Sequence, residues 1–316
     1  MEASAESWFG SRTSTWRDWP VDRLVAAKGE TQVSVVLPAL DEEHTVGRIV
    51  AGIRALAKQT GLVDEVIVVD SGSQDATAKV AHEAGAAVYH RDDVLTAHGS
   101  QPGKGEALWK SLAITRGDLL VFVDADLTDF QPHFITGLLG PLLTDPAVVL
   151  VKAFYDRPLL DVSAGGGGRV TELMARPLLN SYFPELAGVV QPLAGEYAAR
   201  RSLLETLPFD AGYGAETGLL LDAVLDAGLD AVAQVDLGER THGRQDTAAL
   251  GQMAATILHT VLSRVYPSDP LGETLTQFRR VNGRVTPVDR PIPGAQRPPM
   301  ITIPEYATRR AIPTRR

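Results

Sequence analysis

The fold is decided by one stretch of the sequence, Leu119-Leu120-Val121-Phe122-Val123-Asp124-Ala125-Asp126-Leu127. It begins with an apolar run of strand length, rich in Val and Phe, which predicts a strand buried on both faces. The carboxyl edge of a parallel sheet is where open α/β folds bind ligands. Two acids at that edge can place one carboxylate on a sugar hydroxyl and the other on a divalent cation that neutralises a diphosphate. The alternative is a turn with two solvated acids, because Asp is a common turn residue.

Two strand–helix units precede this stretch. The first predicts a strand at Val33–Pro38 and a helix over 45–58, with Asp41 as a cap for that helix. The second predicts a strand at Glu65–Asp70 and a helix over 76–84. Such units in series, joined by short turns, form a parallel sheet with right-handed crossovers. The sequence therefore predicts an α/β fold, a Rossmann-like, mostly parallel sheet flanked by helices, with an α-rich C-terminal part.

The turn after the first strand excludes one common function. A dinucleotide-binding domain would carry Gly-x-Gly-x-x-Gly there, whereas this chain has Pro38-Ala39-Leu40-Asp41-Glu42-Glu43. Nicotinamide chemistry is therefore excluded. A nucleotidyltransferase also combines an α/β fold with paired Asp residues, but it would usually carry a glycine-rich and basic loop at the same place. That alternative is weaker and stays open.

Three further segments carry groups suited to binding anions. Lys104 lies in the loop Gly99–Gly105 ahead of a predicted helix, where it is a reasonable diphosphate contact, although such a lysine is more often an ordinary surface residue. Four glycines, Gly165–Gly168, precede Arg169 and another helix. They fit a flexible linker or, as we favour, an anion cradle of backbone N–H groups and one guanidinium. Glu216 occupies a predicted helix N-terminus, where an acid is favoured.

His242 follows a predicted strand and lies in a loop next to Gly243. A single histidine in such a loop is usually a surface residue. It would also make a natural extra ligand for a metal held by Asp126. The sequence pattern leaves both interpretations open.

Composition limits the possible functions. The chain has 316 residues, of which 44% are hydrophobic and 22% charged, as in ordinary globular proteins. Its formal net charge of −9 argues against a general nucleic-acid or anionic-membrane surface. The absence of cysteine rules out disulfides and thiol catalysis and suits a cytoplasmic location. We expect no signal peptide in the polar N-terminal segment and no membrane span.

Both ends of the chain differ from the middle. The N-terminal segment contains Trp8, Trp16 and Trp19 among polar residues, and we expect these rings to pack the segment onto the body or onto a second subunit. From Pro267 onward the chain is rich in Pro and Arg. This tail is predicted either to pack on a partner subunit or to be disordered.

Four motifs in the first half resemble GT-A glycosyltransferases. They are Val-Val-Leu-Pro-Ala-Leu-Asp-Glu-Glu at 35–43, Val-Val-Asp-Ser-Gly-Ser-Gln-Asp at 68–75, Gly-Lys-Gly at 103–105 and Val-Asp-Ala-Asp at 123–126. The second half is similar to the glucosyl-3-phosphoglycerate synthase family. The segments that carry this resemblance are Gly-Gly-Arg-Val-Thr-Glu-Leu at 167–173, Pro-Leu-Ala-Gly-Glu-Tyr at 192–197, Gly-Tyr-Gly-Ala-Glu at 212–216 and Arg-Thr-His-Gly-Arg at 240–244.

The resemblance implies an activity and a division of the chain. The family is a retaining, metal-dependent glycosyltransferase that transfers glucose from UDP-glucose to the 2-hydroxyl of 3-phosphoglycerate. The product, glucosyl-3-phosphoglycerate, starts methylglucose lipopolysaccharide synthesis, and the family works as a homodimer. On this basis residues 1–30 form an N-terminal arm, 31–155 the nucleotide-sugar half, 156–266 the acceptor half and 267–316 a tail with possible dimer contacts.

The resemblance also assigns roles to individual residues. Mg²⁺ or Mn²⁺ would be bound by Asp126 and His242, and catalysis would involve Asp126, Glu216 and Arg240. The donor would be held by Pro38, Ala39, Leu40, Glu42, Asp70, Ser71, Lys104, Asp124, Ala125, Tyr213, Gly214, Ala215 and Glu216. The acceptor would be held by Gly168, Arg169, Val170, Thr171, His242 and Arg244.

Retention without an obvious nucleophile suggests attack by the acceptor hydroxyl on the same face from which UDP leaves. A double displacement would instead need a carboxylate on the far face of the sugar, and Glu216 is the candidate to exclude. Other candidates are a mannosyl-3-phosphoglycerate synthase, another GT-A transferase and a catalytically silent nucleotide-sugar-binding protein.

Overall fold

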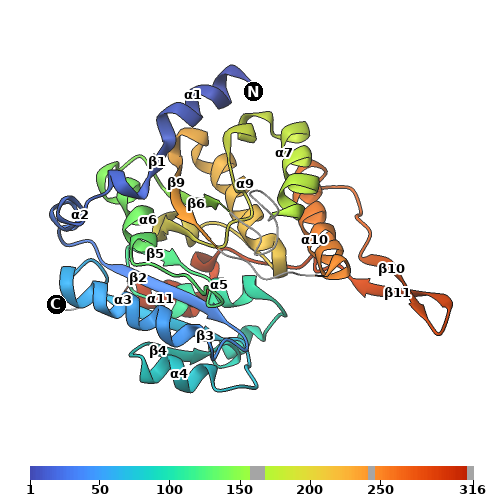
Figure 1. Ribbon diagram of the computed structural model, residues 1–316, viewed down its shortest axis with the longest axis horizontal. Coiled ribbons are helices and arrows are strands. Elements are labelled where there is room, and N and C mark those ends of the chain that lie inside the picture. The colour runs from blue at the N-terminus through green and yellow to red at the C-terminus, as the bar shows by residue number, and fades with distance from the viewer. Residues whose placement is uncertain (157–167, 241–245, 312–316) are drawn as a thin grey trace.

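A computed structural model describes residues 1–156, 168–240 and 246–311 of the chain. Its centre is an eight-stranded sheet in the order β1-β9-β6-β7-β5-β2-β3-β4, parallel except for β7, which runs antiparallel to β5 and β6 (Figure 1). The mostly parallel sheet predicted from the sequence is thus confirmed. The strands are β1 (Thr13–Thr15), β2 (Val33–Ala39), β3 (Glu65–Asp70), β4 (Ala87–His90), β5 (Leu119–Phe122), β6 (Leu150–Asp156), β7 (Tyr197–Arg200) and β9 (Val232–Glu239).

Helices cover both faces of the sheet, and the sheet separates two apolar cores. They are α1 (Ala3–Arg12), α2 (Val21–Lys28), α3 (Val46–Thr60), α4 (Thr77–Glu83), α5 (Lys104–Ile114), α6 (His133–Thr144), α7 (Arg176–Tyr182), α8 (Arg201–Leu204), α9 (Ala215–Ala227), α10 (Thr247–Val265) and α11 (Pro304–Ala311). Successive residues of each central strand point into opposite cores: Phe122 packs with α5 and α9, whereas Val121 packs with α3 and α6. This two-sided burial explains why the strands are apolar without alternation.

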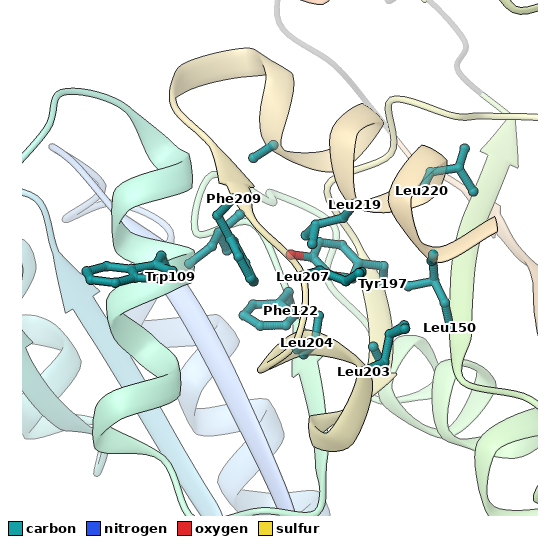
Figure 2. Close-up of a cluster of buried hydrophobic side chains, with 14 of the residues drawn as sticks. Trp109, Phe122, Leu150, Tyr197, Leu203, Leu204, Leu207, Phe209, Leu219 and Leu220 are labelled. Carbon is teal, nitrogen blue, oxygen red and sulfur yellow. The ribbon is translucent and has the colours of Figure 1, made fainter. Parts of the chain in front are cut away.

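The core on the α5 side holds the largest aromatic side chains. Phe122 of β5 and Tyr197 of β7 stack with ring centroids 4.6 Å apart, and Figure 2 shows them between Trp109 of α5 and Leu219 of α9. All four side chains are buried. The antiparallel strand β7 therefore joins the middle of the sheet to the helices of the C-terminal half.

The N-terminal segment is an integral part of the sheet. Strand β1 pairs with β9 and extends the sheet at that edge. The buried Trp8 indole N–H donates to the carbonyl oxygens of Leu229 and Val232, at 3.0 and 2.9 Å. Trp16 stacks on His133 at 4.2 Å between ring centroids. The prediction that these rings attach the segment to the body of the protein is confirmed.

The C-terminal segment is largely ordered and has two parts. A hairpin of β10 (Thr274–Val281) and β11 (Arg284–Pro291) projects from the body beside α10 (Figure 1). The following residues return to the body, where β12 (Gln296–Arg297) pairs with β8 (Phe209–Asp210). Met300, Ile303 and Tyr306 are buried beyond it, and Arg297 forms a bidentate ion pair with Glu106 of α5 at 2.7 Å. The return segment therefore packs on its own chain. The prediction from the sequence, a disordered tail or one packed on a partner subunit, did not include this possibility.

Close backbone contacts join the N-termini of α5 and α9. A Cβ added to Gly105 would overlap the carbonyl oxygen of Asp210, and one added to Gly103 would lie 2.6 Å from the Cα of Gly212. Gly103 also has a φ of 101°, which favours glycine. Because these contacts allow no side chain, the segment that leads into α9 lies directly against the first turn of α5.

Replacing Gly105 by alanine should therefore destabilise the fold by about 1–3 kcal/mol, the usual cost of overpacking, although alanine is the better helix former. Gly10, in helix α1, has open space around its Cα. Gly10→Ala should accordingly stabilise the fold by up to about 1 kcal/mol. Urea denaturation of both variants measures the difference, and equal effects would contradict the close contact.

Candidate functional site

Two acids and a lysine meet at the carboxyl edge of β5. Asp124 and Asp126 follow this strand, and Lys104 is the first residue of α5. The Lys104 ammonium contacts the Asp124 carboxylate and lies 2.6 Å from Glu216 Oε1, at the start of α9. It therefore lies between two acids that are far apart in the sequence. The helix contacts described above bring these residues together. The sequence pattern predicted the two aspartates at the edge of the sheet, but not their contact with Lys104.

Arg240 approaches the same acids from the end of β9. Its Nη2 lies 3.1 Å from Asp126 Oδ1 and 3.5 Å from Asp124 Oδ2. Its Nη1 donates to the Tyr155 hydroxyl at 2.6 Å and to Glu196 at 2.9 Å. Because the guanidinium is only 6% exposed, these contacts fix its orientation. The site therefore has two cations placed beside the Asp-x-Asp pair.

The electrostatics of the two aspartates differ. Burial opposes ionisation of Asp124, but the Lys104 ammonium and the Arg240 guanidinium outweigh it and lower the Asp124 pKa to about 2. Desolvation and the neighbouring Asp124 carboxylate raise the pKa of Asp126, although Arg240 opposes this. Burial and Asp126 also raise the pKa of Glu42, which places Glu42 close to the pair. Asp126 is the less compensated of the two aspartates.

The residues predicted to hold the nucleotide lie on neighbouring strands. Pro38 and Ala39 end β2, and Ala39 pairs with Asp70 at the end of β3. The Ser71 N–H donates to the Ala39 carbonyl at 2.9 Å. Leu40 is 53% exposed above this edge. The Asp70 carboxylate is buried and accepts from the Ser73 N–H and hydroxyl, so it shapes its own turn.

Asp41 does not cap helix α3, contrary to our prediction. That helix begins at Val46, with Thr45 as the preceding residue. Asp41 has a φ of 57°, and its carboxylate accepts from the Gln74 N–H at 2.7 Å. Its own N–H donates to the Ser73 hydroxyl at 2.9 Å. Asp41 thus links the loops after β2 and β3, a contact across 33 residues that no helix-start pattern reveals.

The remaining predicted donor residues lie beside the aspartates or on α9. Ala125 is buried between the two aspartates. Tyr213 is half exposed in the 3₁₀ turn Gly212–Gly214, and Ala215 is buried at the first position of α9. Gly214 packs so closely on Thr260 of α10 that a Cβ would overlap the threonine hydroxyl. The structure therefore places this turn next to Glu216 and holds it against α10.

Only part of the predicted acceptor site falls within the described residues. Gly168 has a φ of 75°, and its carbonyl accepts from the Glu172 N–H at 3.0 Å, which starts a helical segment. Val170 and Thr171 are buried, and Thr171 begins a π-helical turn that ends at Ala175. Such turns are frequent at functional sites. Arg169 lies at the start of this segment. The predicted residues His242 and Arg244, and Gly165–Gly167 of the proposed cradle, lie outside the described residues.

Several residues of the site were not predicted. Glu196 and Tyr155 both bind Arg240, and the Tyr155 hydroxyl donates to Glu196 at 2.9 Å. Gly195 presses on Asp124, since a Cβ there would overlap the carboxylate. Lys152 lies close by in β6 and is buried. A charged residue in an apolar strand was a visible signal for Lys152, and Gly195 and Glu196 lie in the segment 192–197 that carries the family resemblance. Nothing local marked Tyr155.

The donor set fits a divalent cation in part. Within residues 1–156, 168–240 and 246–311, no three His, Cys, Asp or Glu side chains form a ready metal cluster. The Asp126 side chain is, however, 59% exposed, and it pairs with Arg240 through Oδ1 alone, which leaves Oδ2 to bind a hard cation. The predicted second ligand, His242, lies outside the described residues. A bound diphosphate would supply further oxygens.

These features define a class of protein. A mostly parallel sheet with Asp-x-Asp at its carboxyl edge, beside a lysine and an arginine, is the arrangement of a GT-A glycosyltransferase, an enzyme that uses a nucleotide sugar and a divalent metal. The sequence model described as Glycosyl transferase family 2 matches residues 34–187. No helix among the described residues is both long and apolar enough to cross a membrane.

Similarity to known proteins is more specific. Glucosyl-3-phosphoglycerate synthase of Mycolicibacterium smegmatis is 51% identical over 300 residues, which cover 94% of this chain and 98% of that protein. The crystal structure of glucosyl-3-phosphoglycerate synthase from Mycobacterium tuberculosis in complex with Mn²⁺, UDP and phosphoglyceric acid has a TM-score of 0.83 at 47% identity, covering 92% and 98% of the two chains. This chain belongs to the glucosyl-3-phosphoglycerate synthase family.

A third similarity concerns a different sugar. The crystal structure of mannosyl-3-phosphoglycerate synthase from Rubrobacter xylanophilus has a TM-score of 0.88 at 38% identity, and the match covers 94% of this chain and 99% of that chain. The shared fold is therefore compatible with two sugar donors, while sequence identity is higher to the glucosyl enzymes.

Lys104→Met should destabilise the protein by about 3 kcal/mol at pH 7, because it leaves Asp124 and Glu216 without their shared cation. The Asp124 pKa is depressed in the folded state, so its stabilising contribution is present above pH 4 and is lost as the pH falls toward 2. The difference between wild type and variant should therefore shrink between pH 5 and pH 2.

Urea denaturation at both pH values measures this effect. Lys79→Met is the matched control, because Lys79 is 75% exposed and its ion pair, with Glu83 at 3.9 Å, is long and solvent-exposed. It should change stability by less than about 0.5 kcal/mol. A pH-independent difference for Lys104→Met would contradict the proposed charge pairing.

Proposed function

We propose that this chain transfers glucose from UDP-glucose to the 2-hydroxyl of 3-phospho-D-glycerate with retention, giving glucosyl-3-phosphoglycerate and UDP. The observation that carries the proposal is the convergence of Lys104, Arg240 and Glu216 on the Asp124–Asp126 pair. It is supported by the relative from Mycobacterium tuberculosis, solved with Mn²⁺, UDP-glucose and phosphoglyceric acid at 47% identity. The division into a donor half (31–155) and an acceptor half (156–266) belongs to the same proposal.

The donor binds at the carboxyl edge of β2, β3 and β5. The turns after β2 and β3 hold uracil and ribose, and the backbone groups near Ala39 and Ser71 are held in place for this by the sheet. Asp124 contacts the nucleotide sugar, and its low pKa keeps it an acceptor for hydroxyl groups. Tyr213 and Glu216 face the glucose. The residues in these roles are Pro38, Ala39, Leu40, Glu42, Asp70, Ser71, Lys104, Asp124, Ala125, Tyr213, Gly214, Ala215 and Glu216.

The leaving group is UDP, whose β-phosphate gains charge as the glycosidic bond breaks. Lys104 lies at the N-terminus of α5, and Arg240 is buried beside Asp126, so both cations are placed before the reaction to stabilise that charge. Mg²⁺ or Mn²⁺, held by Asp126 and His242, would add Lewis-acid stabilisation of the diphosphate. Asp126 would thus contribute to catalysis by holding the metal that stabilises the charge on the leaving group.

Retention follows from attack by the acceptor hydroxyl on the face that UDP leaves. The alternative, a covalent intermediate, would need an unengaged carboxylate on the far face of the sugar. Glu216 is only 8% exposed and ion-paired with Lys104 at 2.6 Å. Its contact with a cation supports a role in orienting sugar hydroxyls, so front-face attack is the mechanism we propose.

The acceptor binds where the helical segment after Gly168 begins. A helix N-terminus and the Arg169 guanidinium both suit the phosphate and carboxylate of phosphoglycerate. Val170, Thr171, His242 and Arg244 complete the proposed acceptor site. A mannose donor is the second candidate, because the Rubrobacter xylanophilus enzyme has the same fold over almost the whole chain.

The test is UDP release from UDP-glucose with Mn²⁺, measured with and without 3-phosphoglycerate. We expect UDP release that depends on the acceptor, and no release of GDP when GDP-mannose replaces UDP-glucose. Arg169→Ala should raise the KM for phosphoglycerate about 10- to 100-fold and leave the donor KM within twofold, as expected for losing a charge-assisted hydrogen bond.

Arg176→Ala is the matched control, because Arg176 follows in the same helical segment but is paired with Glu172 at 2.9 Å. It should leave both KM values unchanged. Acceptor-independent release would overturn the acceptor assignment. Faster turnover with the mannose donor would contradict the assignment of glucose as the transferred sugar. An equal effect of Arg169→Ala on the KM values for donor and acceptor would contradict the role of Arg169 in binding the acceptor.

We also propose that the chain is a homodimer and that the β10–β11 hairpin is part of the interface. An isolated two-stranded hairpin is marginally stable in water. This one exposes Phe278 at 70% and Val285 at 58%. Its four Arg and one Asp give it a net charge of +3 in a chain whose formal net charge is −9, so a second copy of the chain is a complementary partner. A cytoplasmic location, suited to a chain without cysteine, completes the proposal.

Light scattering coupled to gel filtration should give twice the chain mass for the wild type. The double variant Phe278→Asp, Val285→Asp should give a monomer with unchanged circular dichroism, because both side chains are exposed within one copy. Leu225→Asp changes an equally exposed side chain on α9 and should leave the dimer intact. A monomeric wild type, or a double variant that stays dimeric, would contradict this interface.

A further inference from the structure

Lys152 is a buried cation that the proposed mechanism does not use. It lies in β6, in the middle of the sheet, and its side chain is 2% exposed. The side chain lines a small cavity with Leu150, Tyr197, Leu219 and Glu216. Figure 2 shows three of these residues, Leu150, Tyr197 and Leu219, in the apolar core on the α9 side of the sheet. An ammonium in such surroundings is costly unless its contacts serve a purpose.

The contacts of this ammonium are few and specific. Lys152 Nζ donates to the carbonyl oxygen of Ala194 at 2.6 Å and lies 5.1 Å from the centre of the Tyr197 ring. Within residues 1–156, 168–240 and 246–311, no carboxylate lies within ion-pair distance of it. The other fully buried lysine, Lys110, is paired with Glu106 at 3.4 Å. Lys152 therefore differs from an ordinary buried ion pair.

Ala194 is followed by two residues that touch the candidate site directly. The backbone of Gly195 packs on the Asp124 carboxylate so closely that a Cβ would overlap it. The next residue, Glu196, is fully buried and binds Arg240 at 2.9 Å. The hydrogen bond from Lys152 thus fixes the loop that presses on one catalytic acid and orients one catalytic cation.

Charge supports the same role. In the part of the chain that the structure describes, four carboxylates, those of Asp124, Asp126, Glu196 and Glu216, pair with only two cations, Lys104 and Arg240. Lys152 is the third cation and faces Glu216 across the cavity. Without Lys152, these four carboxylates would outnumber the neighbouring cations by two before any metal binds.

We propose that Lys152 is a positioning residue for glycosyl transfer, acting through the Ala194 carbonyl to hold Gly195 against Asp124 and Glu196 against Arg240. This inference rests on the proposed function for its assay. Lys152 acts from behind the site and does not touch the substrates. Its ammonium form holds the loop most strongly, because a charged donor makes the stronger hydrogen bond.

The ionisation of Lys152 gives the proposal a measurable signature. Burial lowers the pKa of Lys152 to about 8. The acids that oppose this shift are Glu216 on α9, Glu196 just before β7 and Asp124 after β5, while Lys104 on α5 adds to it. The Tyr197 pKa is raised well above its usual value by burial, so its hydroxyl stays neutral in this range. The ammonium is therefore lost as the pH rises through about 8.

The experiment compares Lys152→Met with wild type in acceptor-dependent UDP release between pH 6 and pH 9.5. Methionine keeps the length of the side chain and removes both the charge and the donor. We expect kcat at pH 7 to fall about 10- to 100-fold, the range seen when an outer contact of a metal site is removed. The KM values should change less than kcat. Wild-type kcat should fall as the pH rises through about 8, and this decline should be absent in Lys152→Met.

Thermal unfolding separates positioning from a structural role. Lys152→Met removes a hydrogen bond and relieves a buried charge, two effects of opposite sign, so the midpoint should change little. The matched control is Lys110→Met, which breaks a buried ion pair away from the site; it should lower the midpoint and leave kcat unchanged. Wild-type kcat in Lys152→Met, or a wild-type profile that is flat to pH 9.5, would overturn the proposal. The second outcome needs no variant and holds even if Lys152→Met does not fold.

The proposed function can fail independently. A wild type that releases no UDP with 3-phosphoglycerate would reject the proposed reaction, and Lys152 would then be judged by the affinity for UDP with Mn²⁺, measured by calorimetry. We expect Lys152→Met to bind UDP at least about tenfold more weakly, because Gly195 would no longer be held against Asp124. Equal affinities would overturn the positioning role in that case.

Discussion

The ammonium of Lys104 is shared between Asp124 and Glu216, and much of the structure serves this contact. Carboxylates crowded at one sheet edge repel each other unless cations lie between them. Lys104 reaches both only because α5 and α9 begin side by side, and they do so because Gly103, Gly105 and the backbone at Asp210 touch without side chains between them. Packing in the core thus sets the electrostatics of the site. Asp126, the proposed metal ligand, is less compensated than Asp124, because only Arg240 pairs with it while Asp124 contacts both Lys104 and Arg240.

Much of the fold was predictable because its signals are local. Strands β2, β3 and β5 are apolar runs that end in polar or kinked turns, and such a run is typical of a strand buried on both faces. The predicted strand Glu65–Asp70 has the bounds of β3, and Glu216 does lie in the first turn of α9. The position of Asp124 and Asp126 directly after strand β5 also agrees with the prediction, whereas the contact between Lys104 and Asp124 was not predicted.

The parts that escaped prediction depend on contacts between distant residues. Glu196 and Tyr155 form one hydrogen bond across 41 residues, and nothing near either of them in the sequence indicates it. Asp41 looked like a helix cap but bonds to a neighbouring loop. Strand β7 enters the middle of the sheet in the opposite direction, which a pattern of repeated strand–helix units does not suggest. Lys152 was visible as a charge in an apolar strand, yet its meaning depends on the loop that packs beneath it.

The return segment after the hairpin has a consequence for how the protein matures on the ribosome. Strand β8 leads into the turn that carries Tyr213 and Glu216, and its pairing partner β12 lies 86 residues further along, with Gln296 bonded to Asp210 at 3.0 Å. Synthesis proceeds from the N-terminus, so the sheet and both aspartates emerge well before Gln296 and Arg297. The backing of the Glu216 turn is therefore added last. A nascent chain can assemble strands β2 to β5 and both aspartates early, but the turn before Glu216 is supported by β12 only after residues 296–297 have been synthesised.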